Sequence, residues 1–143
     1  MAVRQISILM ENKGGPPAEI TALLAQHQIN MRALSVAETQ DFGILHIIVE
    51  DPEKAEAVLR DNQLIFRESA VLAVAMEDSP GSMASVVSKL AQADIPVEYA
   101  YAFITHGTGN ACLILKVNDI AAAEALLKKA GMKPLDEHQL NTL

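Results

Sequence analysis

Few side chains in this 143-residue sequence are grouped in a way that supports catalysis. The sequence contains no HExxH pair, no GxSxG motif and no Walker loop. The histidines are spread along the chain: His27, His46, His106 and His138. His46 lies inside an apolar run, where a packed or hydrogen-bonded core role is favoured over metal ligation. We therefore assign no catalytic residue, no metal site and no cofactor.

Two glycine-containing loops are the remaining candidates for chemistry. They are Asn12-Lys13-Gly14-Gly15-Pro16 and Asp78-Ser79-Pro80-Gly81-Ser82, and each leads from an apolar strand pattern into a helical pattern. Backbone N–H groups at the start of a helix bind anions such as a carboxylate. Asn12 or Asp78 could accept hydrogen bonds from an ammonium group. The loops thus suit an amino acid, although glycine and proline before a helix are also ordinary turn residues.

The two loops belong to an internal duplication. An offset of 66 residues places Leu24-Ala25 on Leu90-Ala91 and Ile29 on Ile95. After the second strand of each copy the offset becomes 68. It places the segment 51–59 (DPEKAEAVL) on the segment 119–127 (DIAAAEALL). A two-residue insertion in the hairpin between the second and third strands accounts for the change, since such loops tolerate insertions.

Each copy shows the same order of elements. Alternating apolar residues predict strands at 6–10 and 71–76, and Asp51 and Asp119 are the expected N-caps of the second helices. The apolar stripe of the helix after Pro80 is predicted at Met83, Val86, Val87, Leu90 and Ala91. Fourth strands are expected at 64–67 and 133–135. The pattern predicts an α+β fold of two tandem ferredoxin-like βαββαβ units, with antiparallel sheets and helices on one face.

The predicted domains are residues 1–70 and 71–143. The segment from Leu64 to Met76 contains neither glycine nor proline, so we expect no flexible linker between them. Half of the residues are hydrophobic and the net charge is −7, which argues against a nucleic-acid partner. The apolar run near the N-terminus is too short for a signal peptide or membrane span, so we expect a cytoplasmic protein. Cys112, the only cysteine, lies in an apolar run and is expected to be a buried thiol.

The duplicated segments resemble the ACT domain, a regulatory module that binds small molecules. Its signature is an acidic residue or Asn, then Pro-Gly, a helix, and Gly-Ile-Asn before the second strand. The segment 78–84 (DSPGSMA) resembles the loop and Ile29-Asn30 resembles the strand start, so the resemblance covers the whole chain once per half. It implies a tandem ACT protein that binds an amino acid at interfaces between its units.

The same resemblance implies which residues hold the ligand. In the first half these are Asn12, Gly14, Gly15, Asn30 and Met31, and in the second half Asp78, Pro80, Gly81 and Val97. The chain departs from the family pattern at Gly14, where proline is expected, and at Pro96, where asparagine is expected. We therefore expect the first half to bind ligand and the second half to be mainly structural.

Three functions follow from these observations. The first is a non-enzymatic amino-acid sensor, expected to be a homodimer without nucleic-acid or membrane partners. The second is a ligand-free dimeric module that regulates an enzyme of amino-acid metabolism. The third is a small acyl-phosphate hydrolase, for which Asn30 and Arg32 are the only suitable pair and for which the first loops lack an arginine.

Overall fold

The structure is a computed structural model that describes residues 2–11, 16–38, 41–105 and 110–143. The chain divides into two compact units. The N-terminal unit is Arg4–Ser69, and the C-terminal unit is Ala70–Leu143 together with Met1–Val3. Each unit is described by itself below.

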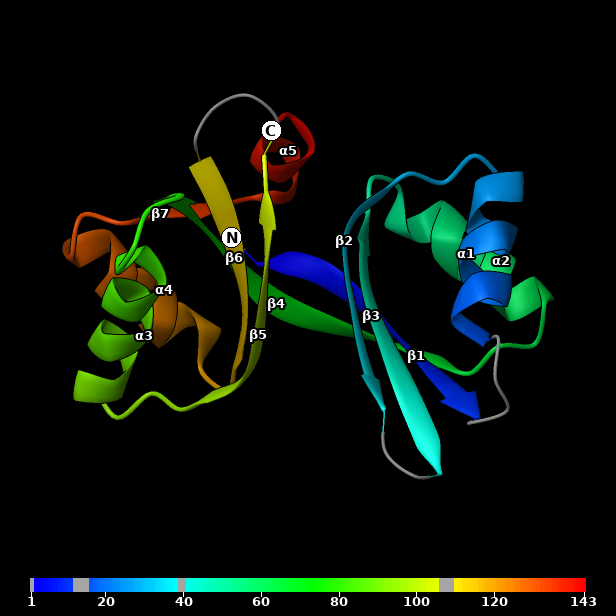
Figure 1. The fold of residues 1–143 in the computed structure, drawn as a ribbon, viewed down its shortest axis with the longest axis horizontal. Coiled ribbons are helices and arrows are strands. Elements are labelled where there is room, and N and C mark those ends of the chain that lie inside the picture. Colours follow the sequence, from blue (N-terminus) through cyan, green and yellow to red (C-terminus); the bar gives the residue numbers. More distant parts are fainter. Residues whose placement is uncertain (1, 12–15, 39–40, 106–109) are drawn as a thin grey trace. The chain divides into compact units, whose positions relative to one another are not determined.

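The N-terminal unit is an antiparallel sheet with two helices on one face (Figure 1). Its strands lie in the order β2-β3-β1-β4, of which β4 contributes its first residues. The elements are β1 (Val3–Glu11), α1 (Pro16–Gln26), β2 (Met31–Glu38), β3 (Phe42–Val49), α2 (Pro52–Asp61) and the start of β4 (Phe66–Glu77). Buried residues of α1 and α2 pack on Ile6, Ile8, Leu45 and Ile47.

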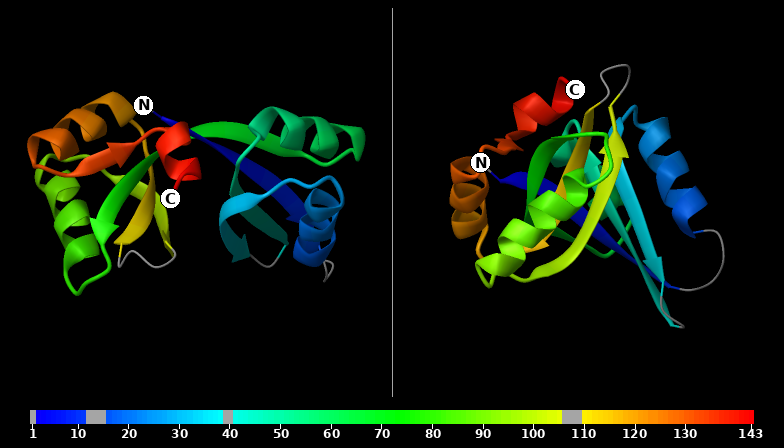
Figure 2. Two further views of the ribbon diagram at one scale, coloured as in Figure 1. Left: turned by 90° about the horizontal axis from the view of Figure 1, so that it is seen from above. Right: turned by 60° about the vertical axis from the view of Figure 1, so that its left-hand side comes forward.

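The C-terminal unit repeats this arrangement, with strand order β7-β4-β6-β5 (Figure 2). Its further elements are α3 (Ser82–Gln92), β5 (Val97–Ile104), β6 (Asn110–Val117), α4 (Ile120–Lys129), β7 (Lys133–Leu135) and α5 (Glu137–Asn141). Val86 and Leu90 of α3 pack with Leu127 of α4 against Leu113 and Leu115 of the sheet. The two ferredoxin-like units predicted from the duplication are therefore confirmed.

Strand β4 joins the two copies differently from the prediction. Separate strands were expected at 64–67 and 71–76, whereas the structure has one continuous strand from Phe66 to Glu77. The physical reason is that no glycine or proline interrupts this segment, so extended backbone continues from one unit into the other.

The predicted stripe of α3 is only partly buried. Val86 and Leu90 are buried, but the side chains of Met83 and Val87 are 46% and 37% exposed. Met83 and Val87 are four residues apart and so lie on the same side of the helix, next to the side formed by the buried Val86 and Leu90. The apolar surface of the helix is therefore wider than the part that contacts the sheet. This leaves an apolar surface next to the start of β5.

Capping residues define where the helices begin and end. Asp51 Oδ1 accepts a hydrogen bond from Lys54 N at 3.1 Å, and Asp119 Oδ1 accepts one from Ala122 N at 3.0 Å. Both N-caps were predicted. Helix α5 was not predicted because it is only five residues long, and it begins with a capping box between Asp136 and Gln139.

Candidate functional site

The loop before α3 turns sharply into the helix at Gly81. This glycine has φ +90° and is the N-cap of α3, and its carbonyl accepts the first helical hydrogen bond from Ser85 N at 2.9 Å. Upstream, Ser79 O accepts a hydrogen bond from Ser82 N at 3.2 Å. Asp78, Pro80 and Gly81 are exposed, so solvent or a ligand can reach the N-terminus of α3. The equivalent predicted residues Asn12, Gly14 and Gly15 lie outside the described residues.

Asn30, at the start of β2, is tied to the end of β3. Its side-chain Nδ2 donates a hydrogen bond of 2.8 Å to Glu50 Oε1, and its carbonyl accepts one from Glu50 N at 3.1 Å. Arg32 Nη1 lies 3.8 Å from the same Glu50 oxygen. Met31 is half-buried against the core. Glu50 was not predicted from the sequence, although its position one residue beyond the third strand places it beside Asn30 once that strand pairs with the second.

The corresponding position in the C-terminal unit has different chemistry. Pro96 replaces Asn30, Glu98 replaces Arg32 and Asn118 replaces Glu50 at the duplicated positions. Pro96 and Val97 line a pocket of about 520 Å³ together with Val87 and Ala91 of α3. The pocket walls are mostly apolar, and Asp94 supplies the one carboxylate among its lining residues.

The sheet register separates the two parts of the predicted site within each unit. Val97 pairs with Val117 at one end of the sheet, whereas Glu77, immediately before the loop, pairs with Asn110 at the other end. Seven residues of strand span about 23 Å. In the N-terminal unit, Met31 pairs with Val49. Glu11, just before the first loop, pairs with Phe42. In the C-terminal unit the loop 78–81 and the start of β5 therefore do not meet, and in the N-terminal unit Glu11 and Met31 lie at opposite ends of the sheet.

The remaining reactive side chains have structural surroundings. His46 Nδ1 lies 2.8 Å from Ser7 Oγ and 3.2 Å from Gln5 Nε2, on the sheet face opposite the N-terminal unit's helices. Desolvation by burial lowers the pKa of His46. Cys112 is fully buried, and burial raises the pKa of its thiol to about 12. The buried thiol predicted for Cys112 is confirmed, whereas His46 is hydrogen-bonded but only half-buried and lies outside the core cluster of the N-terminal unit.

The described residues contain neither a candidate metal cluster nor a candidate membrane-spanning helix. No group of three or more His, Cys, Asp or Glu side chains in that part of the chain is placed to hold a metal ion. None of the helices described in the structure has the length and apolarity needed to cross a membrane.

Sequence comparison agrees with the fold and the duplication. The family model for the ACT domain pair matches residues 1–143, and the chain belongs to this family. The resemblance inferred from the loop and strand motifs is therefore confirmed.

Among solved structures, protein BT0572 from Bacteroides thetaiotaomicron is 34% identical, with a TM-score of 0.91 over 100% of this chain and 98% of that one. The regulatory subunit of aspartate kinase from Thermus thermophilus shares the fold at 15% identity and a TM-score of 0.62, over 89% of this chain and 91% of that one. A curated relative, tyrocidine synthase 2 of Brevibacillus parabrevis, is 29% identical over 115 residues. That match covers 73% of this chain but only 3% of the synthase.

Proposed function

We propose that this protein is a non-enzymatic regulatory protein that binds an amino acid. The observation that carries the proposal is that the family model for the ACT domain pair, a regulatory module, matches residues 1–143. Asp51 and Asp119 are engaged as helix caps, and His46 is engaged in hydrogen bonds with Ser7 and Gln5. The acyl-phosphate hydrolase is disfavoured because the Arg32 guanidinium lies beside Glu50 rather than in an open anion cradle.

The ligand site we propose combines two units. A loop such as Asp78–Gly81 offers backbone N–H groups to the ligand carboxylate, and Asp78 accepts from its ammonium group. The start of a second strand, at Asn30 and Met31 or at Val97, supplies contacts from another unit. The 23 Å separation along one sheet, about the length of a seven-residue span of strand, supports this division.

The two strand starts serve different parts of the ligand. Asn30 is held by Glu50, so its side-chain oxygen is oriented and can accept a hydrogen bond. Pro96 has no side-chain polar group, and the pocket beside Val97 offers mainly apolar walls. We propose that Asn30 forms a hydrogen bond with a polar group of the amino acid. Asn12, Gly14 and Gly15 play the same role in the first half as the Asp78–Gly81 loop plays in the second half. Val97 contributes only van der Waals contact.

The protein acts, in this proposal, as a cytoplasmic homodimer that regulates an enzyme of amino-acid metabolism. Ligand binding can shift such an assembly only if two of its states bind the amino acid with unequal affinity. Isothermal titration calorimetry with each of the twenty amino acids tests the function. We expect saturable heat with one or a few of them. Absence of heat and of thermal stabilisation with all twenty would refute it.

A further inference from the structure

The pocket beside Val97 in the C-terminal unit is lined almost entirely by apolar side chains. It lies between the second half of α3 and the start of β5, and its volume of about 520 Å³ falls within the range of about 300 to 1,000 Å³ that is typical of small-molecule pockets. Its lining consists of Val87, Ala91, Asp94, Ile95, Pro96 and Val97. Asp94 is the one polar side chain among them, so the walls offer contact to an apolar group rather than hydrogen bonds.

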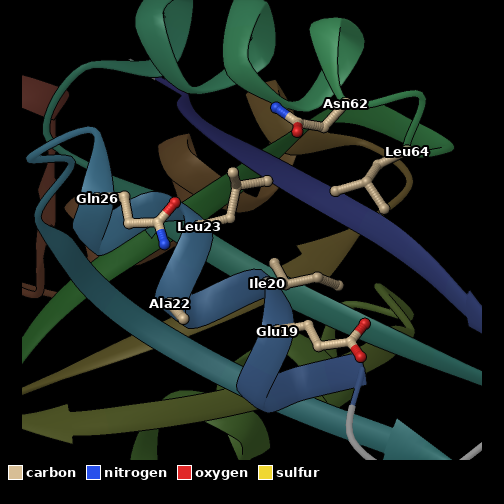
Figure 3. A pocket seen from close by; sticks show the side chains of 7 residues that line it. All are labelled: Glu19, Ile20, Ala22, Leu23, Gln26, Asn62 and Leu64. Atoms are coloured by element: carbon tan, nitrogen blue, oxygen red, sulfur yellow. The ribbon is translucent and has the colours of Figure 1, made fainter.

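Two other hollows of the described residues have polar rims. In the N-terminal unit, a hollow of about 350 Å³ lies between α1 and the residues that follow α2. Figure 3 shows the Glu19 carboxylate at one end of this hollow and the Gln26 amide at the other. In the C-terminal unit, a hollow of about 290 Å³ is lined by two lysines, Lys89 and Lys129. The pocket beside Val97 is larger than either and, unlike both, has a single polar lining residue.

The duplication shows that this apolar chemistry belongs to the second copy. Pro96 stands where the first copy has Asn30, and Val97 stands where it has Met31. The first change removes a side-chain amide, and the second replaces a long side chain by a shorter one. The Asn30 amide is hydrogen-bonded to Glu50, whereas proline has no side-chain polar group that could be held in this way. The two strand starts therefore present different chemistry to a ligand, polar in the first copy and apolar in the second.

An exposed apolar surface on α3 extends the pocket. Val87 is 37% exposed, and Met83, one turn earlier on the same side of the helix, is 46% exposed. Val97 packs against the core, so the apolar wall that is open to a ligand is supplied mainly by Val87, Ala91 and Pro96, all of which are exposed. A hydrocarbon side chain that covers this wall removes apolar area from water. Each methylene group that becomes buried raises the affinity by up to about fourfold.

We infer that the pocket beside Val97 receives the side chain of the ligand, and that the ligand is an amino acid with an aliphatic or aromatic side chain. The inference rests on the proposed function and names the class of amino acid that is bound. The exposed carboxylate of Asp94 disfavours an acidic side chain at this place. It favours lysine less than the walls favour a hydrocarbon, because an ion pair that is open to water contributes little.

Calorimetric titration with pairs of amino acids of similar size tests the inference. Valine and threonine differ by a methyl and a hydroxyl group, and leucine and asparagine differ by two methyl groups and an amide. We expect valine to bind at least about threefold more tightly than threonine, and leucine at least about tenfold more tightly than asparagine. Equal or tighter binding of threonine, asparagine or lysine would overturn the inference and leave the proposed function standing. Absence of binding by all twenty amino acids would overturn both.

Filling the pocket tests its location. Ala91 is exposed and lines the pocket, so Ala91→Leu adds bulk toward Val87 without disturbing the core. We expect the affinity for leucine and phenylalanine to fall at least about fivefold. The affinity for the amino acid alanine, whose side chain is a single methyl group, should change less than about twofold.

Ala93→Leu is the matched control for this variant. Ala93 is an exposed residue directly after α3 and lines the lysine-containing hollow instead, so this variant should keep the wild-type affinities. Circular dichroism checks that both variants are folded. Wild-type affinity for leucine in Ala91→Leu, or the same loss in Ala93→Leu, would overturn the inference.

Discussion

Asn30 Nδ2 donates a hydrogen bond of 2.8 Å to Glu50 Oε1, which fixes the amide at the start of β2 with its oxygen available to a ligand. Asn30→Ala should therefore weaken amino-acid binding about tenfold, equivalent to about 1.4 kcal/mol. Val97→Ala, at the equivalent strand start, should change affinity less than about twofold, because Val97 offers no polar group. Calorimetric titration of both variants checks the difference, and equal losses would contradict the role given to Asn30.

Glu50→Ala separates orientation from direct contact. The variant keeps the Asn30 amide but removes the carboxylate that holds it. We expect a smaller loss of affinity than with Asn30→Ala, since the amide can still reach the ligand after paying the entropy of being ordered. The double variant should lose little more than Asn30→Ala alone, and fully additive losses in the same titration would show that Glu50 acts independently.

Gly81→Ala tests the turn into α3. The residue has φ +90°, and an added Cβ would meet nothing within 4 Å, so the cost comes from the backbone alone. We expect a loss of about 1 kcal/mol in the free energy of unfolding, measured with urea. Gly131→Ala is the matched control, with φ +82° and equally open surroundings after α4.

Both glycine variants should lose similar stability, but only Gly81→Ala should weaken ligand binding, because its loop presents the helix N-terminus. Equal affinity in the two variants would argue against a ligand at this loop. The comparison needs no assumption about which amino acid binds, provided that the same one is titrated into both proteins.

The partial burial of His46 predicts a pH dependence of stability. Because desolvation lowers the pKa of His46 in the folded state, the unfolded chain binds the proton more readily. This contribution to stability is present above the unfolded pKa of about 6.5 and is lost as the pH falls below it. Urea unfolding from about pH 7.5 to about pH 5 should show a shallower decline for His46→Gln than for wild type. His138→Gln, at an exposed position on α5, should retain the wild-type slope.

Cys112 should be unreactive in the folded protein. The side chain is fully buried, and burial raises the pKa of the thiol to about 12, so almost no thiolate is present at pH 8. An absorbance assay with a disulfide reagent should show modification only after urea is added. Rapid labelling without denaturant would show that β6 opens far more often than its packing suggests.

Most of the fold could be predicted from the sequence, because the duplication shows the pattern of each repeated element in two copies. The N-caps at Asp51 and Asp119 follow from local chemistry, and the structure has them where predicted. Helix α5 was missed because five residues give no periodic signal. The exposed side chains of Met83 and Val87 were placed in the core, since an apolar stripe does not reveal how wide the opposing sheet is.

The candidate site was less predictable than the fold. The resemblance to the ACT domain predicted that Asp78, Gly81 and Val97 all bind ligand in the second half. The pairing of Val97 with Val117, however, puts the start of β5 far from the loop that contains Asp78 and Gly81. Only the strand register shows this, and register depends on pairings between distant segments. The hydrogen bond between Asn30 and Glu50 likewise required the pairing of two strands before it became visible.

The most direct test of the central claim is calorimetric titration of the full chain with each of the twenty amino acids. We predict saturable binding of at least one amino acid, weakened by Asn30→Ala and by Gly81→Ala but not by Gly131→Ala. Binding of no amino acid by a protein shown to be folded would contradict the claim.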